Sequence, residues 1–460
     1  MPINSFLYPG PTNSNPYVVD NSCRFNRADS AYMHKTPGGA GSTKIFTFSA
    51  WVKRASIGSN QLIFNAGEGD TTDDWLFYFH SGDQIKIFDF SNGGATTNIA
   101  VVTNQVFRDV SAWYHLVLAV DTSQGTAANR VKLYVNGTQV TSLETATYPS
   151  QDFVIDVNST DAHWIGRRGD NNDYFDGYMA EVCMIDGTQY AASDFGEFDE
   201  DSPTIWKPKD VSGLTFGTNG FYLDFEDSAN LGNDKNGGTD LTEVNLAATD
   251  QSSDSPTNNF CTLNPLDGGL NGTFSEGNLK LVTAGSGYAT TRGTFGVSSG
   301  KWYFEGKLIS GNAEIGIIKT SVDIMDADNP LGKTANGYAY TNGGNKYTND
   351  TNTSYGDTFT DDDIIGVTLN LDDGEIKFYK NGTVQNSGTA AFTSLASDVY
   401  HPGVSDDSGS TACTWELNFG NPPFSISSGN ADENGYGNFE YAPPSGFYAL
   451  CTKNLAEFGG

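Results

Sequence analysis

Short runs in which apolar and polar residues alternate recur along almost the whole chain. In "KIFTFSAWV" the apolar residues Phe46, Phe48 and Val52 fall on alternate positions, and "IIGVTLNL" at 364–371 repeats the pattern. Side chains of a β-strand alternate between its two faces, so this spacing predicts strands with one buried face. No helical period accompanies it. The fold class that we expect is all-β, with two antiparallel, jelly-roll-like β-sandwiches in series.

The strand-forming runs fall into two blocks, separated by a stretch of different composition. Residues 21–188 and 268–460 hold the two expected sandwiches. Residues 189–267 contain four prolines and several acidic tracts, so we expect a connector that packs on the first sandwich and can lend it a strand. Residues 1–20, rich in proline and asparagine, are expected to be an extended N-terminal arm that becomes ordered against a partner surface.

One hairpin sequence occurs in both blocks. "KLYVNGTQV" starts at residue 132 and "KFYKNGTVQ" at residue 377, each with Asn-Gly between two strand-forming runs. Asn and Gly tolerate the positive φ angles of a two-residue type I′ turn, so both are predicted to be tight hairpins. Nothing else repeats at this offset. We therefore interpret them as one turn solution used twice and not as a duplication.

The acidity of the chain limits its partners. It has 25 Lys and Arg against 56 Asp and Glu, a formal net charge of −31. Binding to nucleic acid needs clustered positive charge, so nucleic acid is a poor partner. Two interpretations of the acidity stay open: self-repulsion that keeps the protein soluble, and acidic loops that recruit divalent cations.

The five cysteines lie at positions 23, 183, 261, 413 and 451, with no C-x-x-C motif and no Cys/His cluster. A zinc site is therefore not indicated. The odd number leaves at least one thiol unpaired, which favours folding in a reducing cytoplasm. The N-terminus lacks the pattern of a signal peptide, and the longest apolar runs are too short to span a membrane. We expect neither export by a signal of this sequence nor membrane insertion.

The first block resembles laminin G-like, or concanavalin A-like, lectin/glucanase domains. The resemblance rests on "FTFSAWVKR", "WYHLVLAVD", "VKLYVNGTQV", "WIGRRGD" and "YFDGYMAEVCMIDG", in that family's order across about residues 45–187. The second block is similar to SPRY domains. Its matching pieces, across about residues 296–406, are "SGKWYFEGKL", "AEIGI", "GYAYTNGGNKY", "FTDDDIIGVTLNLDDGEIKFYKNG" and "YHPGVS".

The two domains in this order resemble structural proteins of tailed bacteriophages, notably marine ones. The resemblance implies a virion component, such as a fibre, a head or tail appendage, or a host-recognition subunit. It implies two kinds of partner: other virion proteins, contacted through the N-terminal arm, and a glycan or protein of the host surface. The chain would be made in the host cytoplasm and released by lysis. Such appendages are often trimers, but no heptad run fixes the oligomeric state here.

Catalytic motifs in the sequence are weak. The Glu-x-Asp-x-x-Glu strand of laminarinase-type enzymes has its nearest counterpart in Glu197–Ser202, where serine replaces the last glutamate. His115 lies in an apolar run, which favours a hydrogen-bonded core histidine. Neither a G-x-S-x-G elbow nor a phosphate loop occurs. We therefore expect a protein that is not an enzyme; a purely architectural subunit and a polysaccharide depolymerase are the alternatives.

The stretch "IGRRGDNNDYFDGYMAEV" at 165–182 gathers several candidate site residues. Asp170, Asn172, Asp173 and Asp176 carry the oxygen ligands that calcium prefers, but turns favour the same residue types. Arg168-Gly169-Asp170 spells the integrin-binding tripeptide, which we interpret as a strand that ends in a surface loop. The stretch is predicted to be first of all a turn between two strands, with a bound calcium ion or recognition as additions that the sequence leaves open.

Recognition of a glycan or another surface is the function that we expect from the loops. Sugars bind where an aromatic ring and polar side chains meet on a rigid scaffold. The alternative for each aromatic residue is a place in the core. The candidate ligand-binding residues lie in three loops: Asp70, Asp73 and Trp75; Arg168, Asp170, Asn172, Asp173 and Tyr174; and Tyr338, Tyr340, Asn345 and Tyr347.

Overall fold

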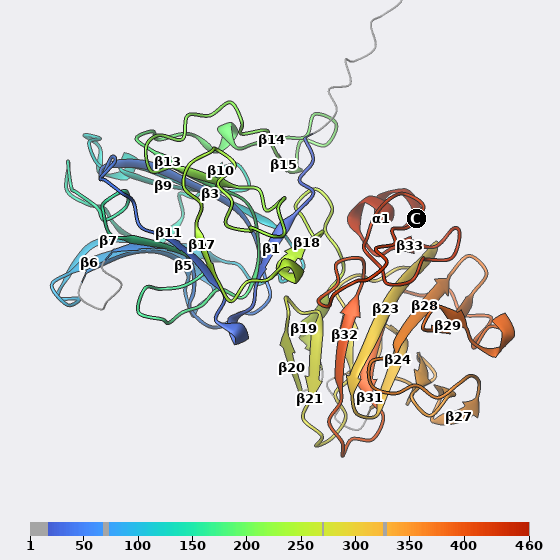
Figure 1. The fold of residues 1–460 in the computed structure, drawn as a ribbon. Helices are drawn as coiled ribbons and strands as arrows, with labels where there is room; N and C mark the ends of the chain where they lie inside the picture. The colour runs from blue at the N-terminus through green and yellow to red at the C-terminus, as the bar shows by residue number, and fades with distance from the viewer. Residues whose placement is uncertain (1–16, 68–72, 269–270, 325–328, 460) are drawn as a thin grey trace, which may run out of the picture.

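The computed structural model describes residues 17–67, 73–268, 271–324 and 329–459, so most of the expected arm lies outside the described residues. Nearly all its elements are strands, which form two sandwiches in series along the chain (Figure 1). The described strands pair antiparallel, except that β33 (Tyr448–Ala449) runs parallel to β23 (Lys301–Ser310). The expected all-β fold of two antiparallel sandwiches is confirmed.

The first sandwich consists of two eight-stranded sheets. One sheet has the order β10-β9-β8-β3-β13-β1-β18, with β16 paired to β13: β1 (Ser22–Phe25), β3 (Ile45–Arg54), β8 (Tyr114–Asp121), β9 (Val131–Val135), β10 (Thr138–Gln139), β13 (Gly177–Asp186), β16 (Phe221–Leu223) and β18 (Gln251–Ser252). The other has the order β11-β7-β6-β5-β4-β12-β2-β17: β2 (Tyr32–Lys35), β4 (Gln61–Gly67), β5 (Asp74–Phe79), β6 (Gln84–Ser91), β7 (Thr96–Val106), β11 (Leu143–Thr147), β12 (Ala162–Ile165) and β17 (Thr242–Val244).

The alternation read from the sequence places the core of this sandwich. Phe46, Phe48 and Val52 on β3 are fully buried, and the Phe48 ring stacks on Phe64 of the opposite sheet at 4.9 Å. Burial of each such side chain stabilises the fold by about 1.5–3 kcal/mol. Phe48 and its neighbours therefore hold the two sheets together.

Most of the segment 189–267 is built into the first sandwich. Its β16, β17 and β18 pair with β13, β2 and β1, while β14 (Gly196–Phe198) and β15 (Trp206–Pro208) form a separate hairpin. Phe195, Val211 and Phe216 from this segment pack on Val117 of β8, so the outer face of that strand is covered as well. This cover explains why β8 is apolar on both faces.

The second sandwich begins before residue 268, because β19 (Leu263–Gly268) pairs with β22. One sheet has the order β19-β22-β31-β24-β25-β26-β27, with β22 (Thr291–Gly293), β24 (Ala313–Lys319), β25 (Gly337–Thr341), β26 (Asn345–Thr348), β27 (Thr351–Ser354) and β31 (Tyr400–Asp406). The other has the order β20-β21-β32-β23-β28-β29-β30, with β20 (Gly272–Ser275), β21 (Lys280–Thr283), β23 (Lys301–Ser310), β28 (Ile364–Asn370), β29 (Glu375–Lys380), β30 (Thr383–Val384), β32 (Thr414–Asn418) and β33 (Tyr448–Ala449).

Helical structure is confined to short pieces in the described ranges. These are α1 (Thr452–Phe458) and five 3-10 turns: η1 (Arg27–Asp29), η2 (Ala127–Asn129), η3 (Ala192–Asp194), η4 (Ala248–Asp250) and η5 (Asn386–Gly388). No helix of the described chain is long and apolar enough to cross a membrane. All five cysteines are buried and unpaired.

Both predicted Asn-Gly hairpins are confirmed. Asn136 and Gly137 join β9 to β10 with φ angles of 46° and 76°. Asn381 and Gly382 join β29 to β30 with φ angles of 47° and 76°. Positive φ at both central positions is the signature of a type I′ turn, so the two sandwiches use the same turn.

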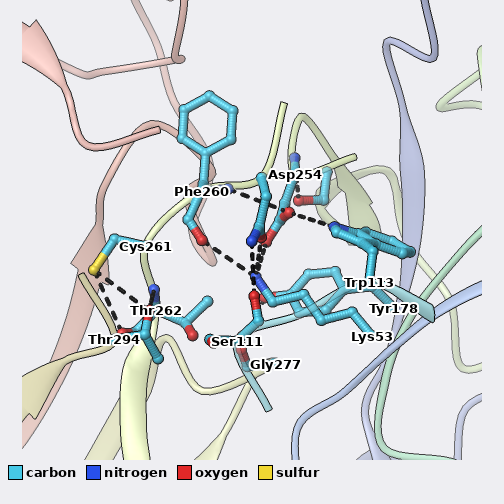
Figure 2. Close-up of polar contacts among 12 residues, drawn as sticks. Lys53, Ser111, Trp113, Tyr178, Asp254, Phe260, Cys261, Thr262, Gly277 and Thr294 are labelled. Atoms are coloured by element: carbon cyan, nitrogen blue, oxygen red, sulfur yellow. Dashed lines mark hydrogen bonds and ion pairs between the residues drawn. The ribbon is translucent and has the colours of Figure 1, made fainter. Parts of the chain in front are cut away.

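A buried polar network joins the two sandwiches (Figure 2). Lys53 on β3 is 1% exposed, and its ammonium donates to Asp254 Oδ2 at 2.7 Å, to Asn259 Oδ1 at 2.7 Å and to the Phe260 carbonyl at 3.2 Å. The other carboxylate oxygen of Asp254 accepts from the Trp113 indole at 3.0 Å. Because these charges are paired and hydrogen-bonded, the fold tolerates them away from water.

Direct contacts reinforce this junction. The Tyr178 hydroxyl on β13 donates to the Gly277 carbonyl of the second sandwich at 2.9 Å, and Asn278 donates to the Ala55 carbonyl at 2.8 Å. A methyl group at Gly277 would lie 2.2 Å from the Tyr178 hydroxyl oxygen, so only glycine permits this approach. The two sandwiches therefore meet in a packed, hydrogen-bonded interface.

Candidate ligand-binding site

The loop 166–176 between β12 and β13 forms a compact turn. The Arg168 amide donates to the Asn172 carbonyl at 3.0 Å, and the Phe175 amide closes the loop on the Gly166 carbonyl at 2.8 Å. Asn171 and Asp173 have φ angles of 63° and 54°, a conformation that asparagine and aspartate adopt more readily than most residues. The composition of the stretch is thus explained by its turn.

Two arginines tie the loop to the sheet beneath. The Arg167 guanidinium lies 3.7 Å from the centre of the Tyr32 ring. Arg168 pairs with buried Asp74 at 3.1 Å and with Asp170 at 3.6 Å. The charged ends of the Arg-Gly-Asp tripeptide therefore pair with each other and with the sheet. Its interpretation as the entry into a loop agrees with this geometry.

Asp74 is the buried carboxylate beneath the loop that pairs with Arg168. Burial raises its pKa to about 6, although the Asn65 amide and the Arg168 guanidinium oppose the shift. The Asn65 amide also fixes the loop backbone, because its Oδ1 accepts from the Gly169 amide at 2.7 Å. Above about pH 6 the ionised Asp74 holds Arg168 by charge as well as by hydrogen bonding.

Beside this turn lies an open recess of about 300 Å³. Arg27 of η1 forms one wall: its guanidinium donates to the Tyr174 carbonyl at 2.8 and 3.0 Å, to Ser59 Oγ at 2.8 Å and to the Asn60 carbonyl at 2.9 Å. The residues around the recess are Arg27, Ser59, Asn60, Asn171, Asn172, Asp173 and Tyr174.

The recess is polar, with one aromatic ring at its edge. Burial raises the pKa of Asp173, and hydrogen bonding from Asn60 and the charge of Arg168 partly offset the rise. The exposed Asn172 amide can both donate and accept hydrogen bonds. Tyr174 adds a half-buried ring. Such a lining suits a ligand rich in hydroxyl groups.

The structure brings together only part of the predicted site. Asn172, Asp173 and Tyr174 line the recess, while Arg168 and Asp170 pair with each other outside its lining. The sequence did not indicate Arg27, Ser59 or Asn60, which come from other connections and meet the loop only through strand pairing. Their sequence neighbourhoods carry no motif that marks them.

The loop before β5 contributes no ligand-facing ring. Trp75 is fully buried, with its ring 5.3 Å from Phe46 and 5.6 Å from Phe64, which corrects our expectation that it faces a ligand. Its neighbour Asp73 is half-buried, and Asp70 lies outside the described residues.

The aromatic residues expected to bind ligand in the second sandwich are mostly core residues. Tyr340 is fully buried and stacks on Phe378 at 5.1 Å, and Tyr347 is 7% exposed, so both correct our expectation. Tyr338 packs edge-on against Phe392 at 5.2 Å. Asn345 is half-buried on β26. These side chains mainly complete the packing of the sandwich.

The expected calcium ligands do not converge on one point. Asp170 faces Arg168, Asp173 bonds to Asn60, and the pKa of Asp176 is raised by burial while Ser56 and Arg27 contact its carboxylate. Within the described ranges no three His, Cys, Asp or Glu residues could hold a metal ion together. The carboxylates thus have protein partners, and the cluster expected from Asp170, Asn172, Asp173 and Asp176 is not assembled.

Two groups of residues that could act in catalysis make structural contacts instead: His115 with Ser49, and Glu197 with Asp199. The Trp206 indole donates to His115 Nδ1 at 2.9 Å, so the proton of this neutral ring sits on Nε2, which lies 2.9 Å from Ser49 Oγ. Burial lowers the pKa of His115 to about 3. In this tautomer the imidazole cannot take the proton of Ser49. Glu197 and Asp199 both pair with Lys207, at 3.6 and 3.3 Å.

Sequence comparisons match two parts of the chain. Residues 28–190 match the Concanavalin A-like lectin/glucanases superfamily, and residues 301–421 match the SPRY domain. An ATP-dependent RNA helicase, Ddx1 of Drosophila melanogaster, is 29% identical over 163 residues, which are 35% of this chain and 19% of that protein. The chain thus spans about a fifth of the length of this relative.

Two solved structures are also similar. The SPRY domain of human HERC1 is 20% identical, with 34% of this chain and 96% of that chain covered and a TM-score of 0.29. The stonustoxin structure is 20% identical, with 34% of this chain and 27% of that chain covered and a TM-score of 0.30. The family matches fall one on each sandwich, so the first sandwich is similar to concanavalin A-like lectin/glucanase domains and the second to SPRY domains.

Proposed function

We propose that this chain is a non-enzymatic structural protein of a tailed-phage particle whose first sandwich binds a glycan of the host surface. The recess beside the loop 166–176 is the observation that carries the proposal. It presents amide, carboxylate and phenol groups of Asn172, Asp173 and Tyr174 on a loop that Arg27 and Arg168 hold in place. The concanavalin A-like and SPRY domain types both fit a binding role.

The size and chemistry of the recess favour a sugar as its ligand. Its volume of about 300 Å³ lies at the lower end of the range for small-molecule sites. The loop is fixed before the ligand arrives, so little entropy is lost when its side chains meet hydroxyl groups. The Tyr174 ring offers an apolar surface for one face of a sugar.

We further propose a structural role for the chain in the phage particle. The chain is a fibre or a head or tail appendage, made in the host cytoplasm and released in the virion by lysis. The N-terminal arm contacts other virion proteins, and a trimer is the oligomer that we propose. The buried junction around Lys53 supports this role, because it turns two domains into one stiff spacer.

Binding of the full chain to polysaccharides of candidate host surfaces tests the glycan proposal. Asn172→Ala with Tyr174→Ala removes two ligand-facing groups and should weaken binding about tenfold or more, since each lost contact is worth about 0.5–1.5 kcal/mol. Asn129→Ala is the matched control, because Asn129 is an exposed asparagine elsewhere on the same sandwich. Equal binding by the double variant and the control would refute the proposed site.

Two other results would change the proposed function itself. Incorporation into particles without any binding to host polysaccharide would favour the purely architectural role. Release of reducing ends from a polysaccharide would favour a depolymerase. The pairing of Glu197 and Asp199 with Lys207, and the tautomer of His115, argue against these groups as catalysts.

A further inference from the structure

A second recess lies on the outer face of the first sandwich, beside the hairpin β14–β15. It has a volume of about 440 Å³, and Tyr134, Ala191, Gly196, Phe198, Trp206 and Lys209 are among its lining residues. Phe198, which pairs with Trp206 across the hairpin, is 45% exposed, and Ile205, which precedes Trp206 in the chain, is 57% exposed. Two large apolar side chains left in water beside an aromatic recess indicate a surface that is covered by something.

The recess is preformed around Trp206. The indole nitrogen is fixed by its hydrogen bond to His115, and the Phe198 ring meets the indole edge-on at 4.9 Å. A methyl group at Gly137 would lie 2.4 Å from the indole ring, and one at Gly196 would lie 2.6 Å from it. The glycines therefore let two backbone segments press against Trp206, which gives the recess a rigid aromatic wall.

The N-terminal arm enters the sandwich next to this wall. The Tyr17 hydroxyl donates to Glu181 Oε2 at 2.9 Å, and the Val19 carbonyl accepts from Ser255 at 2.6 Å. Tyr17 and Trp206 pack against the same buried cluster, which consists of Val19, Trp51, Trp113, Tyr178 and Ala180. Tyr17, the first described residue, therefore lies on the same buried cluster as the Trp206 wall of the recess.

The sequence of residues 1–16 suits an aromatic groove. "MPINSFLYPGPTNSNP" contains four prolines in 16 residues, together with Phe6, Leu7 and Tyr8. Proline-containing segments in an extended polyproline conformation bind grooves lined by aromatic side chains. Tyr17 is eight positions after Pro9, which at a rise of about 3.1 Å per residue gives a reach of about 25 Å.

We propose that residues 1–16 dock in the aromatic recess of the first sandwich of their own chain. The inference goes beyond the proposed function, because it needs neither a glycan nor a virion partner. It also adds a consequence for assembly. An arm that contacts another virion protein must first leave this recess, and the exposed Phe198 and Ile205 then become available for a new contact.

Engineered cysteines test the docking in the full chain. Pro11→Cys with Lys209→Cys places one thiol on the arm and one at the rim of the recess, while the five natural cysteines stay buried. Under mild oxidation at micromolar concentration we expect a disulfide within one chain, found by mass spectrometry. Pro11→Cys with Val399→Cys is the control, because Val399 is 39% exposed on the second sandwich. The Lys209 pair should form at least about tenfold faster, because docking raises the local concentration of its two thiols.

Further results would overturn the proposal. Equal rates of disulfide formation for the two cysteine pairs would mean that the arm does not bind preferentially at the recess. A disulfide formed mainly between chains would mean that a second copy of the chain supplies the arm. Phe198→Ser with Ile205→Ser removes exposed apolar surface without touching the core, so the fold should persist. These substitutions should reduce the rate of the Lys209 pair to that of the control; an unchanged rate would exclude the recess as the docking site.

Discussion

The buried ion pair at the junction allows a quantitative test of how the two sandwiches are held together. Lys53→Met keeps most of the side-chain volume but removes three donated hydrogen bonds, of 2.7, 2.7 and 3.2 Å. It leaves the Asp254 carboxylate, which is 0% exposed, without its cation. Removing one partner of a buried pair typically costs about 3–5 kcal/mol, because the remaining charge is left uncompensated.

The cost should fall on the coupling between the domains. Lys53 belongs to the first sandwich, whereas its acceptors Asn259 and Phe260 lead into the second, so each core remains intact when the lysine is lost. We expect one urea transition for the natural chain and two separated transitions for Lys53→Met. Tryptophan fluorescence and circular dichroism would follow them together.

A second lysine provides the control for this experiment. Lys44 pairs with Asp152 at 3.0 Å, but their side chains are 40% and 59% exposed. Lys44→Met should therefore cost no more than about 1 kcal/mol, as for other exposed pairs. If Lys53→Met costs no more than Lys44→Met, or if a single transition persists at a lower urea concentration, the junction does not couple the domains as argued.

Three further predictions concern single sites. Burial raises the pKa of Glu181 from 4.5 to about 7. Its contribution to stability is therefore complete below about pH 4.5 and declines as the pH rises towards 7. When urea unfolding is compared at about pH 5 and about pH 8, Glu181→Gln should lose less stability between the two than the natural chain. Gly137→Ala should destabilise the chain by about 1–3 kcal/mol more than Gly58→Ala, because both glycines have a φ of 76° but only Gly137 meets Trp206; equal losses in thermal unfolding would contradict the packing described here. Ligand binding at the first recess should weaken below about pH 6, where Asp74 takes a proton and releases its charge pair with Arg168, and Asp74→Asn should remove this pH dependence in titration calorimetry.

The fold was largely predictable because its signals are local. Alternation within β3 is a property of neighbouring residues, and an Asn-Gly turn needs only the two residues that form it. The individual strands that the 189–267 segment adds to the first sandwich were harder to predict. Strands of two or three residues, such as β16 and β18, carry no period, and only their pairing with β13 and β1 identifies them.

The candidate site was predictable only where it lies on one loop. Asn172, Asp173 and Tyr174 share the recess because they are neighbours in a turn. Trp75 was wrongly predicted to face a ligand, although the sequence indicated its burial. It lies an even number of positions from Phe77 and Phe79 on β5, so all three side chains face the core. The acidic residues before Trp75 suggested a loop, but the period of the strand already extended back to it.

Strand β13 connects the three surfaces that the proposals use. It starts where the loop 166–176 ends, Tyr178 contacts the second sandwich, and Glu181 accepts the hydroxyl of Tyr17 at the base of the arm. All ten of its residues are buried. Tyr178 and Glu181 are three residues apart, about 10 Å at the rise of a strand. Glu181 has a φ of 51° at an irregularity in the pairing with β3, which lets it face the arm although Met179, two residues before it, faces the core.

Because this strand lies between β3 and β1 in the middle of its sheet, the positions of the recess, the junction and the arm are fixed by one core. A change in the length of an exposed loop should leave their spacing unaltered. An insertion that shifts the register of β13 should disturb all three together, because a one-residue slip exchanges the two faces of a strand.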